Sequence, residues 1–127
     1  MIKGKKILIT GGTGFIGSHL SEMLVRQGNS VTCFDRYNIN NNWGWLEDSE
    51  LSKDINIILG DIRDFERLKH ALEDIDTVIH AAALKQVPAA EYNPMEFIKT
   101  NIIGAENLIR ASLQSKVKRI VALSTDK

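Results

Sequence analysis

The stretch ILITGGTGFIGSHL, residues 7–20, decides the fold of this chain. Its first residues are rich in β-branched side chains, its last residues form an apolar helical pattern, and the turn between them holds Gly11, Gly12, Gly14 and Gly17. Glycine loses more backbone freedom on folding than any other residue, so four glycines at the head of a helix need a local reason. We interpret the turn as a place where a ligand touches the backbone.

Three of these glycines have a mechanical interpretation. Gly11 allows a tight turn, Gly14 lets backbone N–H groups approach a pyrophosphate at the helix amino terminus, and Gly17 lets the helix pack closely on the strand. Asp35 ends the second expected strand about 20 residues further along, which is the spacing of the dinucleotide-binding fingerprint. The sequence therefore predicts a dinucleotide site, and the alternative is a helix-packing turn that binds no ligand.

Asp35 and Arg36 bear on which dinucleotide binds. A carboxylate at the end of the second strand accepts hydrogen bonds from the adenosine ribose hydroxyls and repels a 2′-phosphate, which favours NAD over NADP. Arg36 follows directly, and its guanidinium is well shaped to bind that phosphate instead. We predict NAD as the cofactor, with NADP as the less favoured alternative.

The rest of the chain alternates short buried runs with amphipathic segments. Five runs are continuously apolar and rich in Ile and Val, which is typical of parallel strands covered on both faces. They are residues 5–10, 30–34, 55–59, 76–80 and 118–123. This order predicts an α/β fold of the Rossmann type, a doubly wound parallel sheet of five strands in the order 3-2-1-4-5, with residues 1–127 as one dinucleotide-binding domain.

Three apolar stripes at helical spacing predict the helices between the strands. The first stripe ends at Gly28, the expected C-cap, and consists of Ile16, Leu20, Met23 and Leu24. The second follows Asp64, the expected N-cap, and consists of Phe65, Leu68, Leu72 and Ile75. The third begins at Asn93 and Pro94 and consists of Ile98, Ile102, Ala105, Ile109 and Ser112.

Residues 36–54 depart from this alternation. The segment holds a cluster of asparagines and both tryptophans, and it is long for a structureless connection. We expect either a functional loop or a short helix around WGWLED, residues 43–48. Trp43 and Trp45 either cap the edge of the sheet or contact a ligand.

Composition and charge narrow the function classes. Sixteen basic residues balance sixteen acidic ones, which argues against a nucleic-acid partner and against an anionic membrane surface. No apolar run approaches the length of a membrane span. The single Cys33 excludes an intrachain disulfide and fits a reducing cytoplasm, where we expect the protein to reside. His19, His70 and His80 lack metal-ligand spacing, so we predict no metal site.

Five motifs in order carry a resemblance to a known family. They are TGGTGFIG, GDIRD after the third strand, HAAALKQV after the fourth, NP followed by KTNIIGAENL on the next helix, and LSTDK after the fifth strand. With them the chain resembles the extended short-chain dehydrogenase/reductases, and within that family the nucleotide-sugar epimerases and dehydratases of polysaccharide biosynthesis. The resemblance covers essentially every residue.

The resemblance implies a set of cofactor contacts. Asp61 bonds the adenine amino group and Ile62 packs on the ring, while Asn101 orders the backbone of the active site. Further contacts are implied for Thr13, Phe15 and Ile16 in the turn, Ala81, Ala82 and Ala83 on the path to the nicotinamide, Lys85 at the phosphates, and Ser124. Taken alone, each residue has an ordinary structural alternative. Lys85 could equally be a solvated surface residue, and Asp61 could be a turn residue.

The segment STDK, residues 124–127, resembles the inverting UDP-N-acetylglucosamine 4,6-dehydratases. By that resemblance Thr125 hydrogen-bonds the sugar 4-hydroxyl, Asp126 protonates the departing C6 hydroxyl, and Lys127 helps remove the C5 proton. An acid and a base on one turn suit the elimination of water across adjacent carbons once C4 is oxidised. NNWGWLED, residues 41–48, is more like a second group of 4,6-dehydratases, and a nucleotide-sugar 4-epimerase is the alternative function.

The family's Tyr-x-x-x-Lys pair does not occur in the chain, because neither Tyr37 nor Tyr92 is followed by lysine four residues later. We therefore expect the chain to bind the cofactor, to meet a nucleotide-sugar substrate only in a longer form, and to be inactive alone. The alternative from another class is a non-catalytic dinucleotide-binding or interaction module. Family members commonly pair through two helices from each subunit, which implies a homodimer through the helix of residues 94–113.

Overall fold

Five parallel strands form one sheet in the order β3-β2-β1-β4-β5, in a computed structural model that describes residues 2–36, 44–82 and 92–123. The order reverses at β1, which pairs with both β2 and β4. The strands are β1 (Lys6–Thr10), β2 (Ser30–Asp35), β3 (Ile55–Leu59), β4 (Thr77–His80) and β5 (Arg119–Ala122). The predicted Rossmann-type doubly wound sheet is confirmed.

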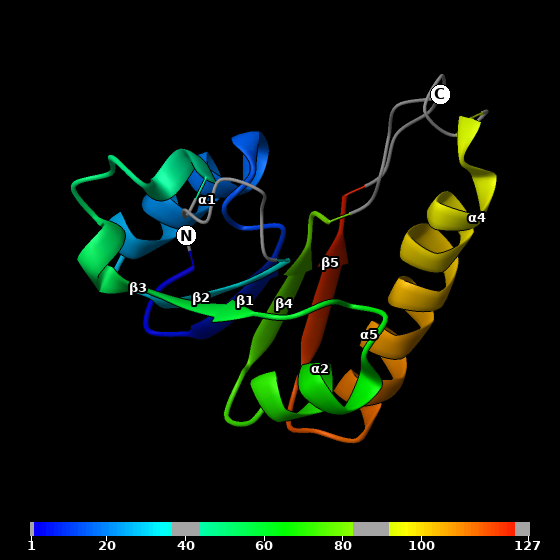
Figure 1. Ribbon diagram of the computed structural model, residues 1–127. Coiled ribbons are helices and arrows are strands. Elements are labelled where there is room, and N and C mark those ends of the chain that lie inside the picture. The colour runs from blue at the N-terminus through cyan, green and yellow to red at the C-terminus, as the bar shows by residue number, and fades with distance from the viewer. Residues whose placement is uncertain (1, 37–43, 83–91, 124–127) are drawn as a thin grey trace.

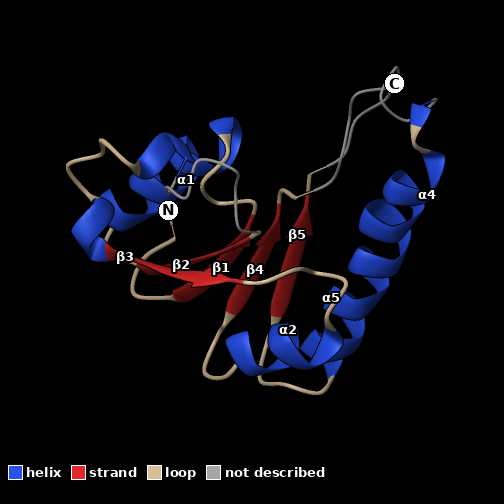
Figure 2. Ribbon diagram, in the orientation of Figure 1, coloured by secondary structure: helices blue, strands red, loops and turns tan. Residues whose placement is uncertain are grey.

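Helices cover both faces of the sheet (Figure 1). One face carries α1 (Phe15–Arg26), and the other carries α2 (Phe65–Ala71) together with a helical column that runs through residues 94–113 (Figure 2). That column consists of α4 (Pro94–Phe97), a π-helical stretch (Ile98–Gly104) and α5 (Ala105–Leu113). Across the described residues, no helix combines the length and the apolar character needed to cross a membrane.

Each strand sends alternate side chains to opposite faces of the sheet, which gives two apolar clusters. Leu8 joins Phe34 and Val78 in the cluster beneath α2 and α5. Ile7 and Ile9, its neighbours in β1, join the cluster beneath α1. Burial on both faces explains why β1, β2 and β4 read as continuous apolar runs. By contrast β5 is an exposed edge strand, so the expectation that every strand is covered on both faces is wrong for β5.

The second predicted stripe is confirmed, because Leu68 and Leu72 are fully buried and the Asp64 side chain caps α2 by accepting the Arg67 N–H. The first stripe is only partly right. Leu24 is buried, but Ile16 and Met23 are exposed, and α1 faces the sheet with the small residues Gly17, Ser18 and Ser21. Close packing of α1 on the sheet therefore depends on small side chains.

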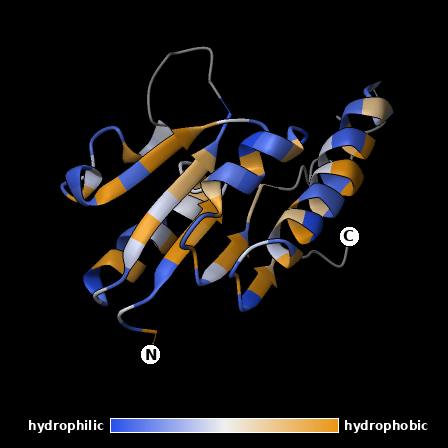
Figure 3. Cartoon of the chain, turned by 90° about the horizontal axis from the view of Figure 1, so that it is seen from below, coloured by the Kyte–Doolittle hydropathy of each residue, from blue (hydrophilic) through white to orange (hydrophobic). Residues whose placement is uncertain are grey.

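The third predicted stripe faces mostly away from the sheet. Ile98, Ile102 and Ile109 are exposed, whereas the sheet-facing side of the column consists of Thr100, Gly104, Asn107, Leu108, Ala111 and Ser112. Figure 3 shows apolar and polar segments alternating along the column. Helical spacing alone finds an amphipathic helix but cannot say which side meets the sheet when both sides carry apolar residues.

Candidate functional site

A pocket of about 420 Å³ lies at the carboxyl edge of the sheet, where the strand order reverses. In open α/β sheets this switch point is where ligands bind. We call it the switch-point pocket, and it is lined by Gly11, Phe34, Asp35, Arg36, Gly60, Asp61, Ile62, Ala82 and Thr100. Six of the residues predicted from sequence are among them: Gly11, Asp35, Arg36, Asp61, Ile62 and Ala82.

The glycine turn closes one side of this pocket. Gly11 has φ +72°, and a Cβ there would lie 3.0 Å from the backbone carbonyl of Ala81, so the ends of β1 and β4 touch through backbone. A Cβ on Gly17 would overlap the Gly11 carbonyl oxygen. Neither position accepts a larger residue without displacing the turn. The predicted roles of these two glycines in turning and close packing match this geometry.

The first turn of α1 presents backbone donors beside Gly11. Gly14 is the N-cap, and within the described part of the chain no side chain caps this turn and no acidic residue lies in it. Phe15 and Ile16 open the helix with exposed side chains. Free N–H groups and the positive end of the helix dipole together favour an anion at this position.

Asp35 ends β2 with its carboxylate on the pocket. Its Oδ2 accepts the Thr13 N–H at 3.1 Å, which ties the turn to the strand. Burial raises the pKa of Asp35 from 3.8 to about 6, although hydrogen bonds from Thr13 and the Gly12 N–H act in the opposite direction. A half-buried carboxylate with remaining acceptor capacity is suited to hydroxyl donors on a ligand.

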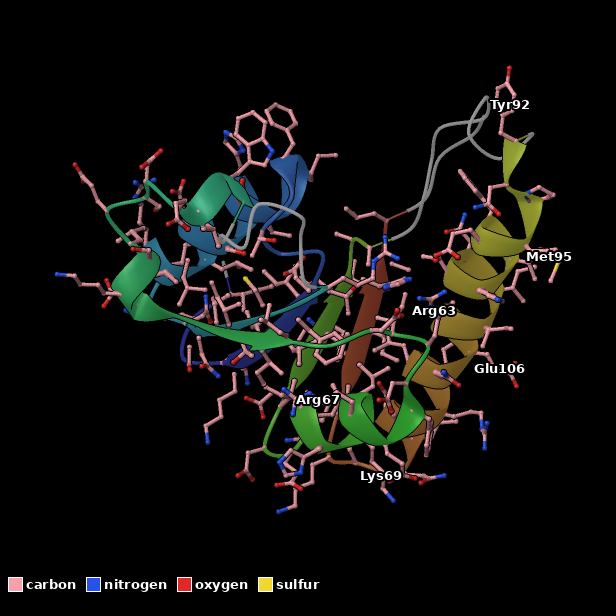
Figure 4. The ribbon with its side chains drawn as sticks, viewed as in Figure 1. Arg63, Arg67, Lys69, Tyr92, Met95 and Glu106 are labelled. Carbon is pink, nitrogen blue, oxygen red and sulfur yellow. The ribbon has the colours of Figure 1, made fainter. Side chains whose placement is uncertain are left out.

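Four charged side chains are linked by ion pairs on another part of the pocket rim. The Arg63 guanidinium donates to the Asp61 carboxylate at 2.6 Å and to both oxygens of Glu96 at 3.2 Å, and Glu96 also accepts from Arg36 at 3.3 Å. Hydrogen bonding from Arg63 holds the pKa of Asp61 below its ordinary value. Figure 4 shows Arg63 on the sheet side of the helical column. Two cations and two carboxylates thus balance one another at this rim.

The column also fixes the segment that carries Ile62. The Asn107 side-chain amide is buried and donates to the carbonyl oxygens of Ile62 and Arg63, at 3.1 and 2.9 Å. A Cβ on Gly104 would overlap the Ile62 side chain, so the helix approaches it closely. Asn107 was missed from sequence. The feature that could have identified Asn107 is its place beside the apolar Leu108 in KTNIIGAENL, which puts a polar side chain on the buried side of a helix.

Thr10 and His80 join the ends of β1 and β4 below the pocket. Thr10 Oγ1 lies 2.7 Å from His80 Nδ1 and accepts the Ala81 N–H at 3.2 Å. The hydroxyl can accept from Ala81 while donating to the imidazole, because it has one proton and two lone pairs. Both side chains are buried, which agrees with a structural role for His80. Ala81 and Ala82 follow His80 directly at the end of β4.

The tryptophan segment contains short 3₁₀ turns, η1 (Gly44–Leu46) and η2 (Ser52–Asp54), so the short helix predicted there is confirmed in part. Trp45 does not cap the sheet edge. Its ring packs edge-on against Phe15 with ring centroids 5.1 Å apart, and its backbone N–H donates to the Thr13 carbonyl at 3.0 Å. Leu46 is the buried residue of this turn. The segment is therefore fastened to the glycine turn.

The remaining predicted positions divide into two groups. Asn101 lies in the π-helical stretch directly after Thr100, which lines the pocket, and such stretches are frequent at functional sites. The other group falls outside the described residues: Ala83, Lys85, Ser124, Thr125, Asp126, Lys127 and Trp43. Within residues 2–36, 44–82 and 92–123, no three His, Cys, Asp or Glu side chains are grouped so as to hold a metal ion.

A family model described as "Polysaccharide biosynthesis protein" matches residues 7–127. The chain belongs to this family. The match begins within β1 and spans the glycine turn and every other element of the sheet.

Several curated relatives match over the whole of this chain, and two of them represent two different reactions. A UDP-N-acetylglucosamine 4,6-dehydratase (inverting) of Campylobacter jejuni subsp. jejuni serotype O:23/36 (strain 81-176) is 47% identical over 134 residues, which are 100% of this chain and 38% of that protein. A UDP-glucose 4-epimerase of Rickettsia bellii (strain OSU 85-389) is 39% identical over 141 residues, with the same two coverages. The chain thus spans 38% of the length of these relatives.

A solved structure gives the same picture. A UDP-glucose-4-epimerase from Stenotrophomonas maltophila with bound NAD and formylated UDP-arabinopyranose is 30% identical, with a TM-score of 0.82 over 96% of this chain and 37% of that one. These likenesses confirm the resemblance to nucleotide-sugar epimerases and dehydratases. A dehydratase and an epimerase both match, so the two reactions are not separated by similarity.

Proposed function

We propose that residues 1–127 form the NAD-binding domain of a nucleotide-sugar 4,6-dehydratase, which oxidises the sugar at C4 and eliminates water across C5 and C6. The observation that carries this proposal is the switch-point pocket. A glycine turn with backbone donors borders the pocket at Gly11, the Asp35 carboxylate lies beside that turn, and the Asp61 carboxylate also lines the pocket. That arrangement suits a molecule with a central pyrophosphate and an adenosine end.

We assign the parts of the cofactor to residues that line the pocket or lie beside it. The first turn of α1 would hold the pyrophosphate, Asp35 the adenosine ribose, and Asp61 with Ile62 the adenine. Asn107 and Gly104 support the adenine contact by fixing the backbone and side chain of Ile62. When bound, NAD supplies the oxidation at C4.

NAD is favoured over NADP because Asp35 lines the pocket and Arg36 is already paired. A carboxylate at the end of β2 attracts ribose hydroxyls and repels a 2′-phosphate. The Arg36 guanidinium, which could bind that phosphate, contacts Glu96. The solved epimerase with bound NAD is in keeping with this choice.

The proposed contacts with the sugar substrate rest on the segment STDK, residues 124–127. Thr125 would hydrogen-bond the 4-hydroxyl, Asp126 would give its proton to the departing C6 hydroxyl so that water leaves, and Lys127 would accept the C5 proton. Support comes from the motif and from the 47% identical dehydratase. By the same likeness the substrate would be UDP-N-acetylglucosamine or a related nucleotide sugar.

A 4-epimerase is the second candidate, because a UDP-glucose 4-epimerase is 39% identical over the whole chain. Epimerisation at C4 needs no acid and base at C5 and C6. The product would then keep its C6 hydroxyl, and Asp126 and Lys127 would be dispensable.

A chimera separates the two reactions. Residues 1–127 would replace the matching portion of the Campylobacter jejuni dehydratase, and the products formed from UDP-N-acetylglucosamine would be identified by NMR. The proposal expects the 4-keto-6-deoxy product, which would form once the hydride taken from C4 is returned to C6 and a proton is returned to C5. Asp126→Asn or Lys127→Ala should slow the elimination by about 10²–10⁴-fold. A product that retains the C6 hydroxyl, with both substitutions mild, would support the epimerase instead. The 127-residue chain alone should give no turnover, because it contains no Tyr-x-x-x-Lys pair.

A further inference from the structure

Arg36 and Arg63 form a two-arginine site on the rim of the switch-point pocket. Arg36 follows Asp35 directly at the end of β2, and Arg63 comes from the segment after β3. Two guanidiniums that converge on one point match the geometry of a phosphate or a carboxylate. A 2′-phosphate on the adenosine ribose would extend toward this rim from the Asp35 side.

Glu96 already fills the point on which these arginines converge. Its Oε1 lies 3.3 Å from Arg36 Nη1 and 3.2 Å from Arg63 Nη1, and its Oε2 also accepts from Arg63 at 3.2 Å. The carboxylate therefore takes the contacts that a phosphate would make. It reaches the rim from α4, a helix that follows the Arg36 position by about sixty residues in sequence.

The start of α4 holds Glu96 in this place. The Asn93 side chain caps the helix by accepting the Glu96 N–H at 3.4 Å, and Pro94 occupies the first turn. The Glu96 side chain is 31% exposed and that of Arg36 is 52% exposed, so water screens the pair and its contribution to stability is small. Its effect on a charged ligand is larger, because a phosphate would have to displace one carboxylate and approach a second, Asp35.

We propose that Glu96 is a specificity-determining residue that excludes NADP by standing in for the 2′-phosphate between Arg36 and Arg63. This inference rests on the proposed dinucleotide function and adds to it a residue outside the glycine turn and the end of β2. Glu96 acts through the arginines and does not contact the reacting atoms, so it is a positioning residue.

The test is a set of calorimetric titrations of the 127-residue chain with NAD and with NADP. Glu96→Gln keeps the shape of the side chain and removes its charge, so NADP should bind about tenfold more tightly while the NAD dissociation constant stays within about twofold. Glu106→Gln is the matched control, since Glu106 projects from the side of the column that faces away from the sheet (Figure 4). That control should change neither constant.

The Arg36→Ala variant distinguishes a role of Glu96 in excluding NADP from a purely structural role of Glu96. In the unaltered chain this substitution should change NADP binding by less than about twofold, because Glu96 already occupies the guanidinium. Combined with Glu96→Gln, it should abolish the gain in NADP affinity. The Arg36→Ala measurement also stands on its own if the Glu96 variant fails to fold, since a loss of NADP affinity of about tenfold would then overturn the inference.

The outcomes separate the inference from the function on which it rests. A chain that is folded and binds neither dinucleotide overturns both. A chain that binds NAD, but whose NADP to NAD ratio is unmoved by Glu96→Gln or moves equally in the Arg36→Ala background, overturns the inference alone. Equal weakening of both dinucleotides with a lower melting temperature would show a purely structural Glu96 and would also overturn it.

Discussion

Asp35 illustrates how one side chain serves both the glycine turn and the pocket. It accepts the Thr13 N–H within the turn and lines the pocket with the rest of its carboxylate. Its place could be predicted because the interval from the glycines to the end of the second strand is set by one helix and two turns. Glu96 and Asn107 could not be predicted, because their partners, Arg36 and Ile62, are brought to them only by the fold.

Asp35→Ala should relax the preference for NAD over NADP. The variant loses a charge-assisted hydrogen bond to the ribose and a repulsion toward the 2′-phosphate, so the ratio of the two dissociation constants should shift by about 1.5–3 kcal/mol. Titration calorimetry with both dinucleotides measures this ratio, and Asp48→Ala, at an exposed position of the connecting segment, is the control. An unchanged ratio would mean that the carboxylate does not contact the ribose.

The raised pKa of Asp35 gives the affinity for NAD a pH dependence. Ribose hydroxyls donate to the charged carboxylate, which becomes protonated as the pH falls through about 6. NAD binding should therefore weaken by up to about tenfold between about pH 7.5 and about pH 5. Asp35→Asn should bind NAD more weakly and with no such step in this range. A wild-type affinity that stays constant across this interval would contradict the assignment.

Stability should show the opposite trend in the chain without ligand. The folded pKa of about 6 lies above the ordinary 3.8, so the folded form holds its proton more tightly than the unfolded form. The contribution of Asp35 to the free energy of unfolding is present at low pH and is lost as the pH rises through about 6. Asp35→Asn should then melt at a higher temperature than the wild type at neutral pH, with the difference shrinking toward about pH 4.

At the scale of elements, the helices meet the sheet through small residues. α1 does so at Gly17, Ser18 and Ser21, and the column does so at Gly104 and Ala111. The strands and the α2 stripe could be predicted, because β-branched runs and one-sided apolar spacing each have a single interpretation. The facing sides of α1 and α5 could not, because close approach selects small residues that a hydrophobicity pattern does not register.

Gly17→Ala and Gly14→Ala should separate packing from ligand binding. A Cβ at position 17 overlaps the Gly11 carbonyl oxygen, so Gly17→Ala should lower the free energy of unfolding by about 1–3 kcal/mol or more. A Cβ at position 14 would lie 3.3 Å from the same oxygen, so Gly14→Ala should fold nearly normally while its methyl group obstructs the pyrophosphate. Chemical denaturation and NAD titration of both variants check this. Equal stabilities would contradict the close packing.

For the whole molecule, the exposed apolar side of the column is the main unpaired surface among the described residues. Met95, Ile98, Ile102, Ile109 and Leu113 are all exposed there, with Ile102 61% exposed. Exposed apolar surface of this kind marks an interaction site, and paired copies of one helix give a closed two-fold dimer. We predict a homodimer that pairs through residues 94–113.

Light scattering at high micromolar concentration should therefore find a dimer. Ile102→Lys should shift it toward the monomer, because a charge at the centre of the apolar side would be desolvated on pairing. Met23→Lys, at an exposed position of α1 on the other face of the sheet, is the control and should leave the dimer intact. A monodisperse monomer of the unaltered chain would remove this prediction.

The central claim is that the switch-point pocket binds a nicotinamide dinucleotide, and calorimetric titration of the folded 127-residue chain with NAD tests it most directly. We predict saturable binding at one site per chain. The affinity should be weak, because the Tyr-x-x-x-Lys contacts are not part of this sequence. The absence of any binding heat at millimolar NAD, with circular dichroism showing a folded chain, would contradict it.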